Sequence, residues 1–190
     1  LAVAAGADVL RAGGTAADAV VAVQAVLGLV EPQSSGLGGG AFLVWHDGAT
    51  GEITTLDGRE TAPLEATPRL FLGAEGQPLE FFEAVVGGRS VGVPGTPALL
   101  AEAQARWGRA DWAGLFDDAI RLAENGFPVS PRLAALVRRD AARLARFPET
   151  RAYFLPGGQP LGEGESPKYA PINNEEWLQQ RLREIGLAKG

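Results

Sequence analysis

The sequence predicts an α+β protein in which helices cover a small antiparallel sheet. Two helical segments come first, a single β-hairpin pattern follows them, and further helical segments fill the second half. This order lacks the strand–helix alternation of a parallel doubly wound sheet, so a layered α+β architecture fits better. The chain has 190 residues, of which 46% are hydrophobic and 21% charged, which is enough apolar material for a core.

The first two helices are expected over residues 1–12 and about 16–29. Apolar residues recur on one face of the first segment, and Gly13 with its neighbouring glycine ends it. Thr15 caps the second helix, and Asp18 stands three residues on, in a capping-box arrangement. The second segment is apolar almost all round, which predicts a helix buried on both sides.

The hairpin is expected from residues 41–47 and 51–57, which are β-like runs joined by a Gly-Ala-Thr turn after Asp47. Residues 61–88 contain several Pro and Gly residues and are expected to be irregular. The stretch "RSVGV", residues 89–93, is compatible with a short strand. The sheet therefore has two predicted strands and at most one addition.

The second half predicts helices separated by Gly- and Pro-rich breaks. The first runs from a Thr96 cap to Gly108, and the next is capped by Asp111 and closed by Gly126. A third is expected over residues 130–147, and an amphipathic helix is expected over residues 174–186.

Composition excludes several function classes. The formal net charge of −6 argues against a nucleic-acid partner, and the absence of Cys excludes disulfides and thiolate chemistry. The most apolar segment, residues 19–30, is too short to span a bilayer, so no membrane span is expected. The chain contains no Met even at position 1, so we expect it to begin inside a longer or processed product.

Two candidate sites have weak support. His46 is the only histidine, and no other metal-ligating residues cluster near it, so neither a metal site nor a cofactor is expected. A serine triad would need His46 to meet one of the serines in space, and no G-x-S-x-G motif supports it. The serines considered are Ser34, Ser35, Ser90, Ser130 and Ser166. The "GLGGG" stretch, residues 36–40, lies between a helix and a strand, so close packing is a better interpretation than phosphate binding.

The stretch "LDGRETAP", residues 56–63, is the strongest candidate for a binding site. It places Asp57, Arg59 and Glu60 where a strand ends and loop begins. A guanidinium group can grip a carboxylate with two parallel hydrogen bonds. From spacing alone, however, a surface ion pair of Arg59 with Asp57 or Glu60 is the favoured interpretation.

Five ordered stretches resemble the γ-glutamyltranspeptidase family over about residues 1–165. They are "GADVLRAGGTAADAVVAV", "VEPQSSGLGGGAFLVW", "LDGRETAPLEAT", "GRSVGVPGTPALLAEAQARWG" and "DAIRLAENGFPVS". The resemblance implies a portion of the large subunit of an N-terminal nucleophile hydrolase with a four-layer αββα sandwich. Such enzymes cut their own precursor, and the Thr that leads the small subunit is the nucleophile. They cleave γ-glutamyl amides such as glutathione and pass glutamyl to water or an amino acid.

The resemblance also implies a role for Arg59. Arg59 corresponds to the Arg that binds the α-carboxylate of the substrate, and we expect Asp57 and Glu60 to hold it in place. No Thr of this chain matches the nucleophile motif, so the chain holds no catalytic residue and is expected to be inactive alone, with a small catalytic subunit as its partner. Residues 166–190 do not follow the family pattern, and the chain stops short of the family's large subunit. The resemblance implies a periplasmic or secreted location, and a cytoplasmic location stays open as an alternative.

Two alternatives remain open at this point. The first is a related acylase or amidohydrolase that acts on another acyl group. The second is a non-catalytic scaffold chain that binds a partner and does no chemistry.

Overall fold

The structure is a computed structural model that describes residues 1–167. The chain divides into two compact units. The first comprises Leu1–Gly28 and Ser34–Phe116, and the second comprises Leu29–Gln33 and the chain from Asp117 on. The predicted boundary at residue 165 is tested by no observation, and the helix predicted over residues 174–186 lies outside the described residues. Both therefore stay predictions.

The two N-terminal helices form as predicted. Helix α1 is Ala2–Arg11 and helix α2 is Ala16–Val30. The backbone N–H of Thr15 donates to the Asp18 carboxylate at 2.8 Å, and the backbone N–H of Asp18 donates to the Thr15 hydroxyl at 3.3 Å. This reciprocal pair is the predicted capping box. Seven of the fifteen residues of α2 are buried, including Val21 and Val26, and only Ala16 and Val20 are exposed, so the helix is largely covered, as predicted.

Strands β1, Ala41–His46, and β2, Ile53–Gly58, pair antiparallel, which confirms the predicted hairpin. Residues alternate between a half-buried face and an exposed face along both strands. In the register, Leu43 lies opposite Leu56 on the half-buried face, and Val44 lies opposite Thr55 on the exposed face. Among the described residues this is a two-stranded sheet. Its half-buried face is covered by other elements, and its other face is exposed.

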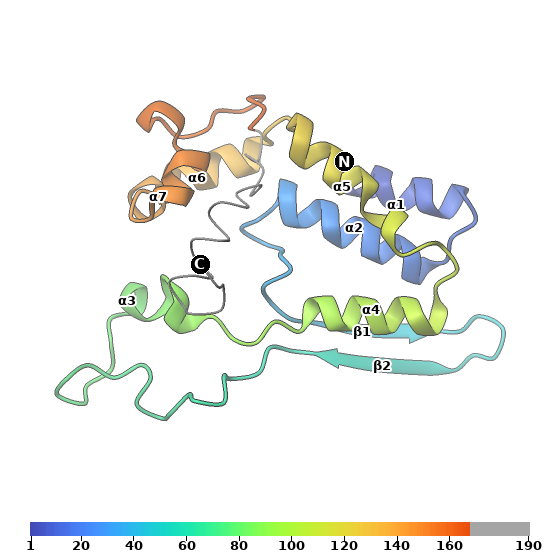
Figure 1. Cartoon of the computed structure of the whole chain (residues 1–190), viewed down its shortest axis with the longest axis horizontal. Helices are drawn as coiled ribbons and strands as arrows, with labels where there is room; N and C mark the ends of the chain where they lie inside the picture. The colour runs from blue at the N-terminus through green and yellow to red at the C-terminus, as the bar shows by residue number, and fades with distance from the viewer. Residues whose placement is uncertain (168–190) are drawn as a thin grey trace, which may run out of the picture. The chain divides into compact units, whose positions relative to one another are not determined.

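Helix α4, Thr96–Trp107, runs along the hairpin and covers its inner face (Figure 1). Leu99 and Leu100 of α4 form a buried cluster with Val21 and Leu115, and side chains of both strands pack against it. The predicted cap at Thr96 was wrong, because the helix is preceded by Gly95 and Thr96 makes no capping hydrogen bond. The carbonyl of Gly39 instead accepts the N–H groups of Gly95 and Thr96 at 3.0 and 3.1 Å. A backbone carbonyl thus replaces the side-chain cap.

Two further predictions need correction. The stretch 89–93 is not a strand: Gly88–Ser90 is a short 3-10 turn, and a single bridge joins Thr61 to Val93. Pro94 has no N–H to extend the pairing. The helix predicted from Asp111 to Gly126 is broken into a 3-10 turn, Ala113–Phe116, and helix α5, Asp117–Asn125.

A buried carboxylate ties two distant turns of the first unit together. Asp18 has no exposed surface, and the backbone N–H of Arg109 donates to it at 2.9 Å. Burial alone would raise the pKa of Asp18, but hydrogen bonds from the backbone of Thr15, Arg109 and Ala110 outweigh it and hold this pKa below its ordinary value of 3.8. The turn before α2 is thereby fixed to the turn after α4.

Among the described residues, the second unit contains α5, α6 and α7. Helix α6, Pro131–Leu144, forms as predicted, and the Ser130 hydroxyl caps it by accepting from Leu133 at 3.0 Å. Helix α7, Pro148–Phe154, was not predicted. The short helix α3, Phe81–Val85, belongs to the first unit and buries none of its residues. Within residues 1–167, no helix is long and apolar enough to cross a membrane.

Candidate functional site

The charged trio lies at the end of β2, where the chain leaves the sheet. Strand β2 ends at Gly58, and Arg59 is the next residue. The Asp57 carboxylate accepts the backbone N–H of Arg59 at 2.9 Å, which bends the chain at the end of the strand. Asp57 therefore acts on the backbone of Arg59 and not on its guanidinium.

The guanidinium of Arg59 is open to solvent. Its side chain is 70% exposed, and its Nε stands 3.5 Å from a carboxylate oxygen of Glu60. That distance is too long for a strong hydrogen bond. Within residues 1–167, the two terminal NH₂ groups of Arg59 have no hydrogen-bond partner. The group is thus held on one side and keeps the two-pronged end that a carboxylate ligand would use.

The glycine stretch before β1 packs against this turn. A methyl carbon added to Gly40 would stand 2.6 Å from the backbone nitrogen of Glu60. The Gly39 carbonyl, in turn, holds the first N–H groups of α4. This agrees with the interpretation that these glycines serve close backbone packing.

The structure does not bring the other candidates together into a site. His46 is exposed at the end of β1, and in the part of the chain that the structure describes no three His, Cys, Asp or Glu residues converge as metal ligands. Three of the five serines considered are bonded elsewhere. Ser35 accepts from Gln24, Ser90 donates to the carbonyl of Val85, and Ser130 caps α6. No hydrogen bond joins these three serines to His46.

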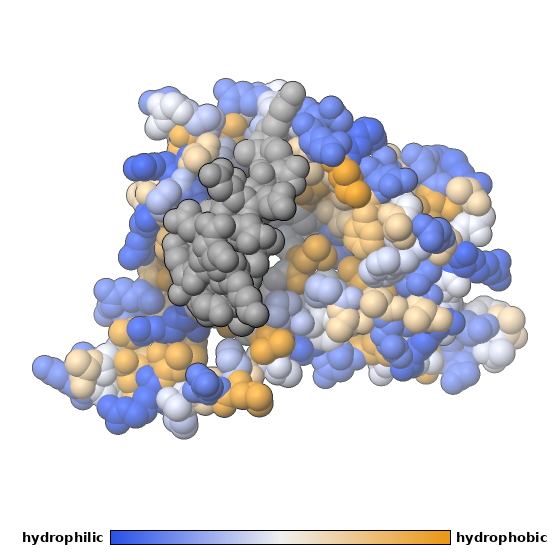
Figure 2. Space-filling view, viewed as in Figure 1, coloured by the Kyte–Doolittle hydropathy of each residue, from blue (hydrophilic) through white to orange (hydrophobic). Residues whose placement is uncertain are grey.

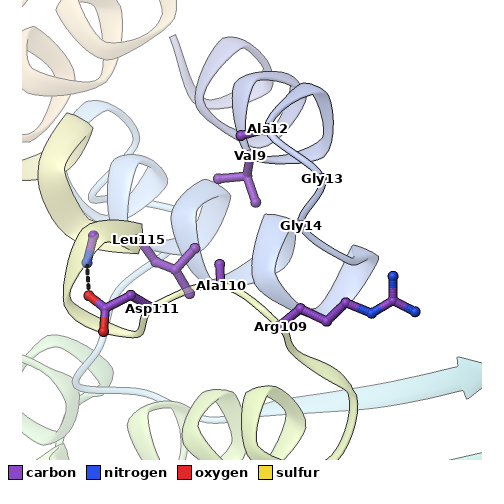
Figure 3. A pocket seen from close by; sticks show the side chains of 9 residues that line it. Val9, Ala12, Gly13, Gly14, Arg109, Ala110, Asp111 and Leu115 are labelled. Carbon is purple, nitrogen blue, oxygen red and sulfur yellow. Dashed lines mark hydrogen bonds between the residues drawn. The ribbon is translucent and has the colours of Figure 1, made fainter.

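A pocket of about 290 Å³ lies at the opposite end of α4 from Arg59 (Figure 3). Helix α4 has 12 residues, so its two ends are roughly 18 Å apart. Val9 and Leu115 line the pocket, and Arg109 reaches away from it. The Asp111 carboxylate at its edge accepts the N–H of Gly114 at 3.1 Å. Among the described lining residues, the guanidinium of Arg109 points away from the pocket, so no charged groups converge there on a substrate.

Apolar side chains are exposed on the sheet and on the segment that follows it. Phe42 and Val44 on β1 are 66% and 70% exposed, and Ile53 on β2 lies on the same face. The segment between β2 and α4 exposes Phe81 and Phe82 among others. Figure 2 shows orange, apolar surface where Figure 1 places this segment. Apolar surface of this extent usually marks a contact with another part of a protein.

Comparison with known proteins gives a consistent result. Residues 2–172 match the family model described as gamma-glutamyltranspeptidase. The chain is 45% identical over 161 residues to the glutathione hydrolase proenzyme of Bacillus subtilis (strain 168), covering 85% of the chain and 27% of that protein. It is 42% identical over 171 residues to the acylase ACY 1 proenzyme of Pseudomonas sp. (strain V22), covering 86% of the chain and 30% of that protein.

Solved structures agree with the sequence relatives. The crystal structure of Helicobacter pylori gamma-glutamyltranspeptidase superposes with a TM-score of 0.84 at 33% identity, covering 97% of this chain and 52% of that one. The likeness confirms the predicted α+β fold. The chain covers 27% of the B. subtilis relative and 30% of the acylase relative, which is about a quarter to a third of the length of these proteins.

Proposed function

The chain belongs to the gamma-glutamyltranspeptidase family, and we propose that it forms part of the large subunit of an enzyme that cleaves γ-glutamyl amides such as glutathione. The enzyme would pass the glutamyl group to water or to an amino acid. In this proposal the nucleophile is the Thr that leads a small subunit cut from the same precursor. The name proenzyme, which the B. subtilis relative carries, supports such processing.

Arg59 carries the proposal within this chain. Its guanidinium binds the α-carboxylate of the glutamyl group through two parallel hydrogen bonds. The supporting observation is an exposed Arg59 whose terminal NH₂ groups have no partner within residues 1–167. The carboxylate of Glu60 lies 3.5 Å from the Nε of Arg59, and Asp57 accepts the backbone N–H of Arg59.

The exposed face of the hairpin is the surface that we propose to contact the rest of the enzyme. Phe42, Val44 and Ile53 would pack against the second sheet of the sandwich, because a fully exposed apolar sheet face is unfavourable in water. The relatives support this, since about three quarters of their length lies outside the match. We place the complete enzyme in the periplasm or outside the cell.

The acylase relatives support a second candidate function, in which the same fold cleaves another amide. Binding of the α-carboxylate by the Arg59 guanidinium, as proposed, favours a glutamyl substrate over an acyl group that lacks this carboxylate. A non-catalytic scaffold is the third possibility, and it predicts no turnover even when the complete precursor is expressed.

Paired substrates test the proposal in the complete precursor. The first is a γ-glutamyl anilide, and the second is the 4-aminobutanoyl anilide, which differs only in lacking the α-carboxylate. Charge-assisted hydrogen bonds contribute about 1.5–3 kcal/mol each, so Arg59→Ala should lower kcat/KM for the first substrate about 10²-fold or more. Arg59→Lys keeps the charge without the two-pronged geometry and should recover part of the loss.

The second substrate and a charge control complete the test. Arg59→Ala should change kcat/KM little for the 4-aminobutanoyl anilide, because this substrate has no α-carboxylate for the Arg59 guanidinium to bind. Arg11→Ala removes an equal charge from an exposed pair with Asp8 and should leave both substrates unaffected. An Arg59→Ala enzyme with wild-type kcat/KM on the glutamyl anilide would refute the proposal. Rapid turnover of other amides with no preference for the glutamyl one would favour the acylase alternative.

A further inference from the structure

Three glycines from distant parts of the sequence enclose the backbone on either side of Arg59. Gly40 precedes β1, and Gly92 and Gly95 precede α4. A methyl carbon added to Gly95 would stand 2.1 Å from the carbonyl oxygen of Gly58. Such a separation is far below van der Waals contact, so this position admits no side chain.

The other two glycines, Gly40 and Gly92, lie close to Glu60. A methyl carbon on Gly40 would stand 2.6 Å from the Glu60 nitrogen and 2.6 Å from one of its carboxylate oxygens. A methyl carbon on Gly92 would stand 2.9 Å from the Glu60 Cβ. The chain is therefore held immediately before and immediately after Arg59.

Close approach is the reason for glycine at these positions. None of Gly40, Gly92 and Gly95 has a positive φ, so their backbone conformations are open to any residue. The neighbouring Gly38 makes the contrast clear. It also has no positive φ, and a methyl carbon there would have no atom within 4 Å.

The side chain of Arg59 gives little positional information of its own. It is 70% exposed, and its Nε lies 3.5 Å from Glu60, so the backbone sets the point and the Cα–Cβ direction from which the side chain reaches out. That backbone is fixed by the contacts with the three glycines, by the hydrogen bond from Arg59 N–H to Asp57, and by the Thr61–Val93 bridge. These contacts join the loop before β1, the end of β2 and the start of α4 at one point.

We infer that Gly40, Gly92 and Gly95 are positioning residues, which aim the Arg59 guanidinium at the substrate carboxylate. The inference rests on the proposed function of Arg59 and extends it to residues that contact the backbone on either side of Arg59. It assigns the end of the Gly-rich stretch a role in substrate recognition through backbone contact.

The expected effect follows from the contact distances. Ordinary contact begins at about 3.4 Å, so an alanine at position 40 must displace the Glu60 backbone by about 0.8 Å or move itself as far. A misplacement of about 1 Å in a positioning group can cost about 10²-fold in rate. We expect Gly40→Ala to lower kcat/KM about 10- to 100-fold on the γ-glutamyl anilide. Gly92→Ala requires a smaller shift and should lose less.

The experiment uses the complete precursor and the same two anilides. Gly40→Ala and Gly92→Ala should lose activity on the γ-glutamyl anilide chiefly through KM, and should retain activity on the 4-aminobutanoyl anilide. Gly38→Ala is the matched control in the same loop and should resemble the wild type on both substrates. If Gly40→Ala does not mature, the milder Gly92→Ala variant decides the question.

Three results would overturn the inference. One is an equal loss on both substrates, which would indicate a general structural defect. Another is no loss in Gly92→Ala together with a wild-type Gly40→Ala. The last is a loss in Gly38→Ala as large as in Gly40→Ala. Arg59→Ala, measured in parallel, separates the proposed function from the positioning role. If Arg59→Ala also loses activity equally on both substrates, the proposed function fails. If Arg59→Ala discriminates between the substrates and the glycine variants do not, only the positioning role fails.

Discussion

Replacing Asp18 should destabilise the fold more than replacing any exposed acidic residue of the chain. Its carboxylate is fully buried and accepts from the backbone N–H of Thr15 at 2.8 Å and from that of Arg109 at 2.9 Å. The Thr15 hydroxyl donates to it at 3.0 Å, and the Gln104 amide donates at 3.4 Å. In Asp18→Ala these donors lose their acceptor while staying in place.

The magnitude follows from the donors left unpaired. A buried polar group without a partner costs about 1–3 kcal/mol, and at least two backbone N–H groups are affected. We therefore expect Asp18→Ala to lower the free energy of unfolding by about 3 kcal/mol or more. Asp18→Asn keeps one oxygen acceptor but turns an NH₂ group toward the donors, so its loss should be smaller yet clear. The matched control is Asp8→Ala, which removes an exposed pair with Arg11 and should cost less than about 1 kcal/mol.

The dependence on pH provides a second readout. The folded state holds the pKa of Asp18 below its ordinary value of 3.8, so the unfolded state takes up the proton first as pH falls. The contribution of Asp18 is therefore complete above about pH 4 and is lost as pH falls through the lower folded-state value. In Asp18→Asn this component of the pH dependence should vanish.

Urea unfolding of the complete enzyme, followed at pH 7 and at several values below pH 4, measures both effects. Equal unfolding midpoints for Asp18→Ala and Asp8→Ala at pH 7 would refute the reasoning. So would a wild type and an Asp18→Asn variant whose stabilities fall in parallel with decreasing pH.

The remaining predictions concern the sheet, the isolated chain and an aromatic stack. Val44→Asp should impair maturation of the complete precursor, seen as loss of subunit cleavage on a denaturing gel, whereas Thr50→Asp in the hairpin turn should mature normally. The isolated chain should show no γ-glutamyl transfer and should self-associate through its open apolar face, and turnover by the purified chain or a monomer in light scattering would argue against this. Trp45 and Trp107 stack with ring centroids 4.7 Å apart, so a double-mutant cycle with alanine should yield a coupling of about 1 kcal/mol, and additive effects would contradict it.

Elements defined by local signals could be predicted from the sequence. Helix α2 and its cap depend on Thr15 and Asp18, which are three residues apart, and α6 begins at a Ser130 cap of the same kind. The hairpin follows from two β-like runs and the short turn between them. In each case the residues that determine the structure are neighbours in the sequence.

The errors have non-local causes. The cap of α4 is the carbonyl of Gly39, which lies more than fifty residues before the helix, so Thr96 was misassigned. Pairing of the stretch around Val93 stops after one bridge to Thr61, a partner that the local pattern does not reveal. Helix α7, which begins at Pro148, lies in a stretch for which no helix was predicted.

The candidate site was predictable only in part. Spacing alone favoured a surface ion pair for Arg59, and the family motif was needed to assign it a ligand. In the structure the Arg59 Nε and the Glu60 carboxylate are 3.5 Å apart, so the interaction within this pair is weak. The contacts of Gly92 and Gly95 with the chain beside Arg59 cross more than thirty residues, so no local signal could have identified them.

The central claim is that Arg59 binds the α-carboxylate of the glutamyl group. A crystal structure of the complete enzyme with glutamate bound tests it most directly. The account predicts two guanidinium nitrogens of Arg59 within about 2.7–2.9 Å of the two oxygens of that carboxylate. An ordered glutamate whose α-carboxylate is held by other groups, with Arg59 turned to solvent, would contradict it.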